Sequence, residues 1–165
     1  MSIEYKNNAM TIKSRMNSAI SNFMRETCVE ISSMTKTNSE DRVKTGQTKG
    51  SYEYKVESSS TKVDGYVGSN FKNAIYEEFG TGEFAKKGGR SGYWVFVKGH
   101  ENGSGNAKSY SLKEAKKVMA ILRKKGLDAY YTKGKTPNEP LKRAFDSTKP
   151  AIESRLAQVL KGLGG

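Results

Sequence analysis

The sequence predicts an α+β fold in which long N-terminal and C-terminal helices pack on a small twisted antiparallel β-sheet. Apolar residues recur at steps of three and four in the first and last parts of the chain, which is the helical period. A tyrosine-rich segment between them alternates apolar and charged residues, as a half-buried strand does. The predicted order is helix, four strands, helix, strand, helix, and this irregular mixture is typical of the α+β class.

The two terminal helices are expected over residues 8–36 and about 140–161. The apolar stripe of the first consists of Ile12, Met16, Ile20, Phe23, Thr27, Ile31 and Met34, with only Thr27 polar. A one-sided stripe of this length must cover a sheet or another subunit. The stripe of the last helix consists of Leu141, Phe145, Thr148, Ile152, Leu156, Val159 and Leu163. Pro150 within it predicts a kink or two abutting helices.

The first two strands are expected over 51–58 and 62–69, joined as a hairpin. In the first of them Tyr52, Tyr54 and Val56 alternate with charged residues, so these three predict the buried face. Further strands are expected over 71–79, 93–97 and 127–132. The polar or glycine-rich segments 37–50, 83–92 and 98–109 predict loops.

A short helix is expected between the last two of these strands. Ser111 and Glu114 have the spacing of a capping box, in which each side chain bonds the backbone amide of the other residue. Ala115, Val118 and Leu122 follow on one face, and Gly126 ends the helix. Residues 93–132 are therefore predicted to form a strand–helix–strand lobe.

Length and composition favour a single domain, and the cysteine content fits a protein of the reducing cytoplasm. The chain has 165 residues, 35% of them hydrophobic, and a single cysteine, Cys28, which excludes an intrachain disulfide. Cys28 lies among apolar residues and is expected to be buried. No apolar run approaches the ~18 residues of a membrane span, and no signal-peptide pattern is present.

The charge balance predicts an acidic partner. The formal net charge is +12, which favours nucleic acid, an anionic membrane or an acidic protein surface, although a solvated lysine-rich surface carries equal weight. Aromatic and basic residues are interleaved at Tyr52, Tyr54, Lys55, Tyr66, Phe71, Lys72, Tyr93, Trp94, Phe96, Lys98, Tyr130, Tyr131 and Lys133. On a sheet they could stack bases and hold phosphates. Placement in the core or at a subunit interface is the favoured alternative.

The sequence offers no convincing catalytic, cofactor or metal site. The only histidine, His100, lies in a glycine-rich segment. Gly134-Lys135-Thr136 resembles the end of a phosphate loop, but position 129 is alanine where that motif needs glycine. The carboxylates of Glu77 and Glu78 would point to opposite faces of the expected strand. A non-enzymatic protein without cofactors is therefore predicted.

Three stretches together resemble the tail-component family of phage HK-97 and related prophage particles. The first comprises 67–70 and 74–82 and ends in Glu78-Phe79-Gly80-Thr81-Gly82; the second is Gly89-Arg90 followed by 93–96; the third is 132–145, with its Pro137-Asn138-Glu139-Pro140-Leu141 turn. The resemblance covers residues ~45–145. It implies one neck or tail-component domain over 1–165, with an insertion at about 99–129.

The resemblance implies structural roles for the motif residues and no active site. These residues are Glu78, Phe79, Gly80, Thr81, Gly82, Trp94, Pro137, Pro140 and Leu141. Gly80 and Gly82 would allow a sharp turn after the strand, and Phe79 would plug the core between sheet and helix. Pro137 and Pro140 would fix the entry into the last helix.

The function implied is assembly at the head–tail junction of a virion. Copies would form a ring, expected to be a hexamer, that joins the head connector or adaptor to the tail terminator or tail tube, after synthesis in the host cytoplasm. Lys86, Lys87 and Arg90 lie in a loop that could meet DNA in the channel or an acidic partner ring, or could simply be solvated. The alternative function is a basic nucleic-acid-binding module that uses the sheet aromatics and lysines.

Overall fold

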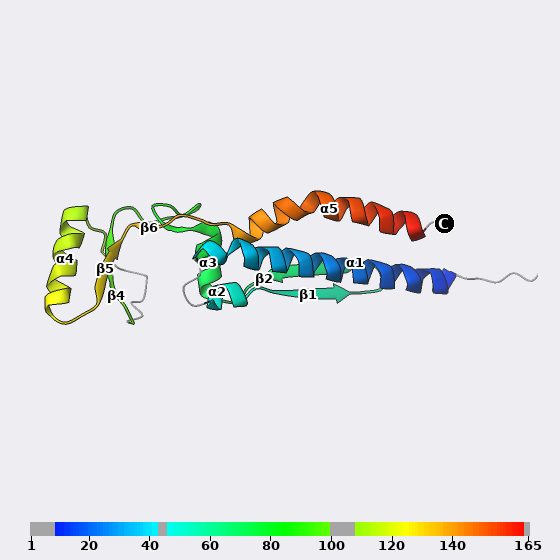
Figure 1. The fold of residues 1–165 in the computed structure, drawn as a ribbon, viewed down its shortest axis with the longest axis horizontal. Helices are drawn as coiled ribbons and strands as arrows, with labels where there is room; N and C mark the ends of the chain where they lie inside the picture. The colour runs from blue at the N-terminus through cyan, green and yellow to red at the C-terminus, as the bar shows by residue number, and fades with distance from the viewer. Residues whose placement is uncertain (1–8, 43–45, 100–107, 164–165) are drawn as a thin grey trace, which may run out of the picture. The chain divides into compact units, whose positions relative to one another are not determined.

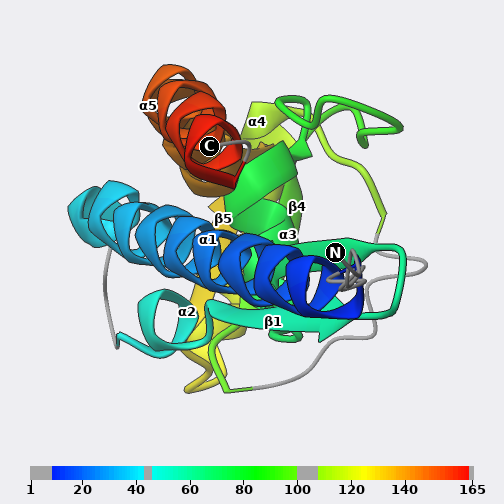
Figure 2. The same ribbon diagram turned by 90° about the vertical axis from the view of Figure 1, so that its right-hand side faces the viewer.

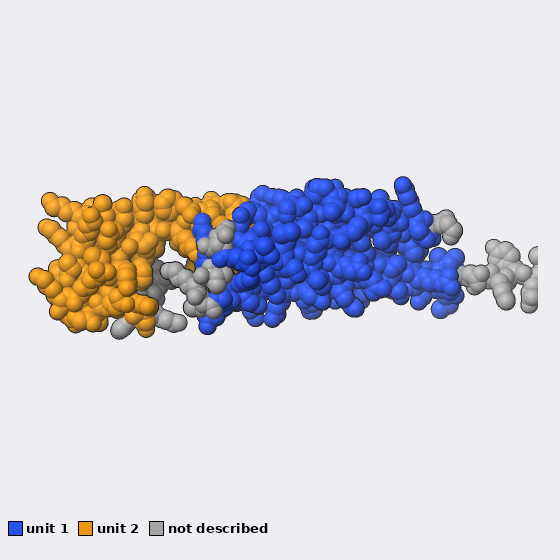
Figure 3. Space-filling model, viewed as in Figure 1, with its two compact units in different colours: residues 1–72, 140–165 blue, residues 73–139 orange. Residues whose placement is uncertain are grey.

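The computed structural model describes residues 9–42, 46–99 and 108–163, and the chain divides into two units. Unit 1 combines residues 1–72 with 140–165, and unit 2 is the continuous segment 73–139 (Figure 3). Long terminal helices and small antiparallel sheets confirm the α+β class. The predicted insertion at 99–129 falls within unit 2 and stays a prediction.

Unit 1 consists of three layers. Helix α1 lies between helix α5 on one side and the β1–β2 hairpin on the other (Figures 1 and 2). The bounds are α1 Ala9–Asn38, β1 Glu53–Ser58, β2 Val63–Gly68 and α5 Pro140–Leu163. Two short helices, η1 Glu40–Arg42 and α2 Gln47–Gly50, occupy part of the segment that was expected to be a loop.

The predicted stripe of α1 is confirmed in the second half of the helix. Phe23, Thr27 and Ile31 are buried, together with Cys28 and Thr35. By contrast, Ile12, Met16 and Met34 are 54%, 39% and 37% exposed. Ile12 and Met16 are exposed because they lie where α1 reaches the turn of the hairpin and extends past it. The amide of Asn17 donates to the Ser59 carbonyl in that turn (3.5 Å), so the preceding turns of α1 extend past the end of the hairpin.

The hairpin turns the face that holds Val56 and Gly65 toward α1, although Tyr54 on the predicted buried face is 44% exposed. Cross-strand pairs Tyr54–Val67, Val56–Gly65 and Ser58–Val63 share that face. Gly65 has a steric role there, because a Cβ at this position would lie 2.5 Å from Cys28 Sγ and 2.6 Å from Met24 Sδ. The close approach of β2 to α1 therefore requires a residue without a side chain.

We expect Gly65→Ala to lower the free energy of unfolding by about 1–3 kcal/mol, the usual cost of overpacking. The added methyl group must displace the Cys28 thiol and the Met24 side chain or push β2 away from α1. Urea denaturation followed by circular dichroism measures the loss. The matched control is Gly68→Ala in the same strand, where a Cβ meets no atom within 4 Å. Equal losses for the two variants would contradict the argument.

Helix α5 confirms the predicted entry but corrects the predicted stripe. Pro140 is its first residue and is almost fully buried, and its carbonyl accepts a hydrogen bond from Asn38 Nδ2 (3.1 Å). Ala144 and Thr148 are the buried residues of the next turns, whereas Phe145 is 50% exposed. The helix continues through Pro150 as one element, and its axis changes direction near the middle (Figure 1). Two abutting helices are therefore not formed.

The segment 71–79, expected to be a strand, is a helix. Helix α3 spans Lys72–Phe79, with Ala74 buried. The Ser69 hydroxyl accepts from the Phe71 amide (3.0 Å) just before the helix, and the Gly80 amide donates to the Tyr76 carbonyl (3.0 Å) at its end. Local bonds at both ends thus favour a helical turn over an extended strand.

The strands of unit 2 form two separate ladders. Strand β3 (Thr81–Gly82) pairs with β6 (Gly134–Lys135), and β4 (Trp94–Val97) pairs with β5 (Ala129–Thr132), both antiparallel. With the hairpin of unit 1, the described residues hold three two-stranded sheets, not the single small sheet that was predicted. Each pair is short, and β3–β6 contains glycines in the left-handed region, which end the ladder after two residues.

The predicted strand–helix–strand lobe is confirmed. Helix α4 (Leu112–Lys124) packs on β5 and β4, with Ala115 and Ala129 fully buried. The Ser111–Glu114 capping box is present, and its hydrogen bonds lower the pKa of the Glu114 carboxyl. Gly126 (φ 79°) ends the helix in a Schellman motif, since the Leu127 amide donates to the Leu122 carbonyl (3.1 Å).

Candidate functional site

The two most specific stretches of the sequence resemblance lie against each other in unit 2. Residues 77–87 and 133–139 meet along β3–β6, and we refer to them as the motif cluster. Thr81 pairs with Lys135, whose amide also donates to the Thr81 hydroxyl (3.0 Å). The Glu83 amide extends the contact by donating to the Lys133 carbonyl (2.9 Å). Residues fifty or more positions apart are therefore held together by backbone hydrogen bonds.

Glycines allow the two stretches to approach this closely. Gly80 and Gly82 have φ angles of 73° and 61°, which confirms the predicted sharp turn, although it follows a helix and not a strand. A Cβ at Gly82 would overlap the Lys133 carbonyl oxygen and lie 2.7 Å from the ring of Trp94. A Cβ at Gly134 would overlap the Thr81 carbonyl oxygen. The cluster is thus built around backbone contacts that exclude side chains.

Glu77 connects the two stretches electrostatically. Its carboxylate pairs with the Lys135 ammonium, and its carbonyl accepts from the amides of Asn138 (2.7 Å) and Glu139 (3.2 Å). These bonds hold the Pro137–Pro140 turn that leads into α5. Lys135 therefore neutralises a carboxylate inside the cluster, and Gly134-Lys135-Thr136 belongs to a strand and a turn, not to a phosphate loop.

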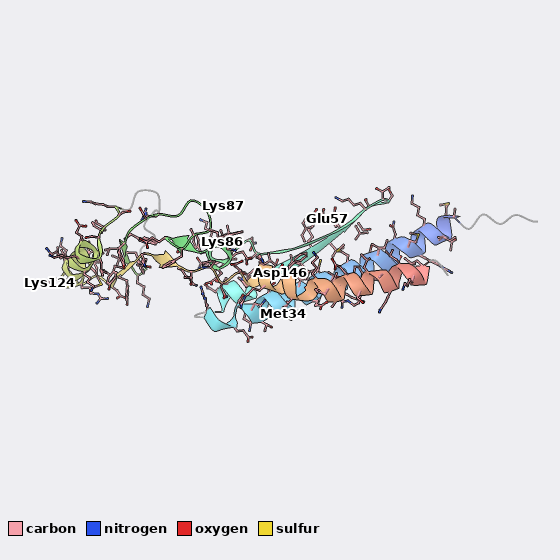
Figure 4. All side chains as sticks on the ribbon, turned by 90° about the horizontal axis from the view of Figure 1, so that it is seen from above. Met34, Glu57, Lys86, Lys87, Lys124 and Asp146 are labelled. Carbon is pink, nitrogen blue, oxygen red and sulfur yellow. The ribbon has the colours of Figure 1, made fainter. Side chains whose placement is uncertain are left out.

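The basic loop that was expected to meet DNA or an acidic partner is partly satisfied within unit 2. Lys86 pairs with Glu139 (2.5 Å), and its amide donates to the Phe79 carbonyl (3.0 Å). The Arg90 guanidinium lies 5.3 Å from the centre of the Trp94 ring. Lys87, labelled beside Lys86 in Figure 4, is exposed and forms no ion pair with any described carboxylate. The three cations are therefore not equally open to a partner.

Helix α3 presents an exposed apolar surface. Ile75, Tyr76 and Phe79 are 58%, 46% and 53% exposed, and we refer to these three residues as the α3 patch. The expected role of Phe79 as a core plug is wrong, because α3 buries Ala74 instead. Leu141, by contrast, is half-buried in the first turn of α5. Three large apolar side chains on an eight-residue helix indicate a contact surface.

A second exposed surface lies on the β4–β5 ladder. Alternation puts Val95, Val97, Tyr131 and Ala129 on the side that α4 covers, and Trp94, Phe96 and Tyr130 on the other side. Phe96 and Tyr130 stack at 5.7 Å between ring centres and are 37% and 40% exposed. We refer to Trp94, Phe96 and Tyr130 as the aromatic face.

Cations adjoin the aromatic face. Arg123 lies 5.3 Å from the centre of the Tyr130 ring and donates through Nε to the Ala129 carbonyl (2.8 Å). A hydrogen bond to Asp128 raises the pKa of the Tyr130 phenol. The aromatic face therefore has a guanidinium group at both ends, Arg123 beside Tyr130 and Arg90 beside Trp94.

The structure divides the interleaved aromatics of the sequence between core and surface. Tyr52 is buried in unit 1, and the Tyr93 and Tyr131 rings pack edge to face at 5.8 Å on the α4 side of the lobe. Tyr66 is 52% exposed on β2. Of the two alternatives drawn from the sequence, placement in the core is therefore confirmed for Tyr52, and base stacking on the exposed rings stays a prediction.

The described residues provide little for chemical catalysis. Cys28 is buried, and burial raises the pKa of its thiol, so the nucleophilic thiolate is disfavoured. Across residues 9–42, 46–99 and 108–163, no group of three or more His, Cys, Asp or Glu side chains could hold a metal ion. His100 lies outside the described residues. Within the same ranges, no helix is both long enough and apolar enough to cross a bilayer.

Comparison of the chain with models of known families, with curated proteins and with solved structures finds no match.

Proposed function

We propose that this chain is a structural protein of the head–tail junction in a tailed phage or phage-like particle. Copies would form a ring, expected to be a hexamer, that joins the head connector to the tail. The observation that supports this proposal is the motif cluster. The Glu78–Gly82 and Pro137–Leu141 stretches that carry the resemblance are far apart in sequence, and the segments that contain them pack together through backbone bonds.

The chemistry of the motif cluster suits a structural role. Its ion pairs, Glu77 with Lys135 and Lys86 with Glu139, are internal, so these groups neutralise each other. Glycines at the closest approaches leave no room for a substrate between the two stretches. Such an arrangement fixes the end of α3 and the chain that enters α5, and it holds the neighbouring side chains in place for a partner.

The α3 patch is the surface we assign to the contact between neighbouring copies. The helix that carries these side chains ends at Phe79, directly before Gly80, so the motif cluster anchors that helix. Burial of exposed apolar surface stabilises association by roughly 25 cal/mol per Å². The charge of +12 opposes self-association, so we expect the ring to need salt, DNA or acidic neighbours.

Cryo-electron microscopy of phage or phage-like particles, purified from the organism that encodes this chain, tests the proposal. We expect a ring of this chain at the head–tail junction, with the α3 patch in the contact between copies. Ile75→Glu places a charge in that contact and should prevent incorporation into particles, measured by mass spectrometry of purified particles.

The matched control is Ile121→Glu on α4. Ile121 is 55% exposed, close to the 58% of Ile75, and it lies outside the α3 patch. This variant should be incorporated normally, and thermal unfolding should be similar for both variants. Absence of the wild-type chain from purified particles would refute the assembly proposal. Equal loss of incorporation for both variants would refute the assignment of the patch.

A further inference from the structure

The aromatic face of unit 2 is the exposed surface that the proposed function leaves unexplained. Phe96 and Tyr130 lie opposite each other on paired strands, and their ring planes differ by only 26°. Helix α4 covers the other side of the ladder, as Ala115 and Ala129 show by their complete burial. The two rings are only partly buried, so they contribute little to the core of unit 2, and their flat apolar surfaces are accessible to a partner.

The cations around these rings indicate the charge of that partner. Arg123 lies over Tyr130 and Arg90 over Trp94. Lys98 directly follows β4 and is exposed; its amide bonds the Asp128 carbonyl (2.8 Å), so strand alternation puts its side chain on the side of Phe96. An acidic residue, Asp128, also lies at this face, and its carboxylate is engaged by the Tyr130 hydroxyl. A polyanion therefore complements the face.

The surrounding lobe reinforces this preference. Residues 108–132 contain seven lysines and arginines against two acidic residues. The lysines on the outer side of α4 form no ion pair with any described carboxylate; they are Lys113, Lys116, Lys117 and Lys124. Lys124, the last residue of that helix, is labelled beside it in Figure 4. Lys117 also interacts electrostatically with Glu114, but the four lysines outnumber this carboxylate, so they add to the attraction that the lobe exerts on an anion over several ångströms.

We propose that the aromatic face binds single-stranded nucleic acid. Bases would stack on Phe96 and Tyr130, and phosphates would meet Arg123, Lys98 and Arg90. Single strands expose base faces and phosphates together, and nearly parallel rings flanked by cations match both groups. The bases of a duplex are stacked on one another and do not reach such rings, and an acidic protein offers charge without π faces. This proposal is independent of the one for the head–tail junction.

The test uses the full chain and a fluorescein-labelled oligothymidylate of about 20 nucleotides, longer than the ~4–16 that a single small fold covers. Fluorescence anisotropy measures the dissociation constant over a series of salt concentrations. We expect Phe96→Leu and Tyr130→Leu each to weaken binding by about 5- to 150-fold, the effect of losing one stacked base. Phe96→Tyr keeps a ring and should bind like the wild type.

Two further variants separate stacking from charge. Tyr66→Leu is the matched control, because Tyr66 is also an exposed ring on a two-stranded sheet but lies in unit 1. It should leave binding unchanged. Lys98→Gln should reduce the slope of log affinity against log salt by about 0.7, the value for one phosphate contact on a single strand. The leucine variants should leave that slope unchanged.

Each alternative outcome overturns the proposal. Absence of binding at low salt would do so directly, and so would equal affinities for wild type, Phe96→Leu and Tyr130→Leu. Displacement of the oligonucleotide by a duplex of the same length as effectively as by the single strand would indicate a surface that senses charge alone. Displacement by polyglutamate to the same extent would indicate an acidic protein partner. Circular dichroism spectra confirm that the leucine variants remain folded.

Discussion

Replacement of Gly82 by alanine is expected to destabilise unit 2 by about 2–5 kcal/mol. About 1–2 kcal/mol comes from the left-handed backbone conformation, with φ at 61°, which a Cβ disfavours. The remainder comes from overlap of the Cβ with the Lys133 carbonyl oxygen, a backbone atom that cannot rotate away. The β3–β6 ladder would have to open, which separates the two stretches of the motif cluster.

Gly88→Ala is the control for this substitution. Gly88 has nearly the same φ angle, 63°, but a Cβ there meets no atom within 4 Å. This variant should lose only the backbone contribution of about 1–2 kcal/mol. The difference between the two variants therefore isolates the steric requirement of the motif cluster.

The single tryptophan provides the measurement. Trp94 lies in unit 2 with its ring against Gly82, so its fluorescence reports on the environment of the motif cluster. In a urea titration the midpoint of the fluorescence change should fall strongly for Gly82→Ala and moderately for Gly88→Ala. Equal shifts would mean that the close approach to Lys133 contributes nothing to stability.

Replacement of Phe23 by alanine is expected to destabilise unit 1 by about 3–5 kcal/mol, the range for removal of a buried aromatic ring. Phe23 is 7% exposed on α1, the middle layer of the unit. The lost ring leaves a cavity that the helix and its neighbours cannot fill without moving. A urea titration followed by far-UV circular dichroism, a signal that the long helices α1 and α5 dominate, measures this loss of unfolding free energy.

Phe145→Ala is the matched control for Phe23→Ala. Phe145 is 50% exposed on α5, and its removal should cost within about 1 kcal/mol. The result also tests the corrected stripe of α5, since the sequence pattern favoured Phe145 as a buried residue and the structure buries Ala144. A loss at Phe145 as large as that at Phe23 would contradict the placement of the α5 helix face.

Local sequence signals predicted the elements whose causes are local. The hairpin followed from the alternation of Tyr52, Tyr54 and Val56, and α4 followed from Ser111, Glu114 and Gly126. The prediction of a strand over 71–79 was wrong, because it relied on the aromatic and apolar residues of the segment, which favour strands. Its apolar residues at 71, 74, 75 and 79 have helical spacing, and that signal was present in the sequence.

Long-range packing decided the features that the sequence could not supply. Ala144, and not Phe145, lies on the buried side of α5, and the packing of α5 on α1 decides which side that is. The pairing of Glu77 with Lys135 joins a residue of helix α3 to a residue of strand β6, and no spacing rule connects these two positions. The side of β4–β5 that α4 covers could have been inferred, because Ala129 is the one small residue in an aromatic strand.

Unit 1 is assembled from both ends of the chain, and this has a consequence for folding during synthesis. Unit 2 is one continuous segment and can complete its contacts as soon as residue 139 leaves the ribosome. Helix α1 and the hairpin emerge earlier but lack the layer that α5 supplies, because that helix begins only at Pro140. The apolar side of α1 that α5 later covers is therefore open to chaperones or to other nascent chains until α5 has been synthesised, and unit 1 closes only after the whole of unit 2 has emerged.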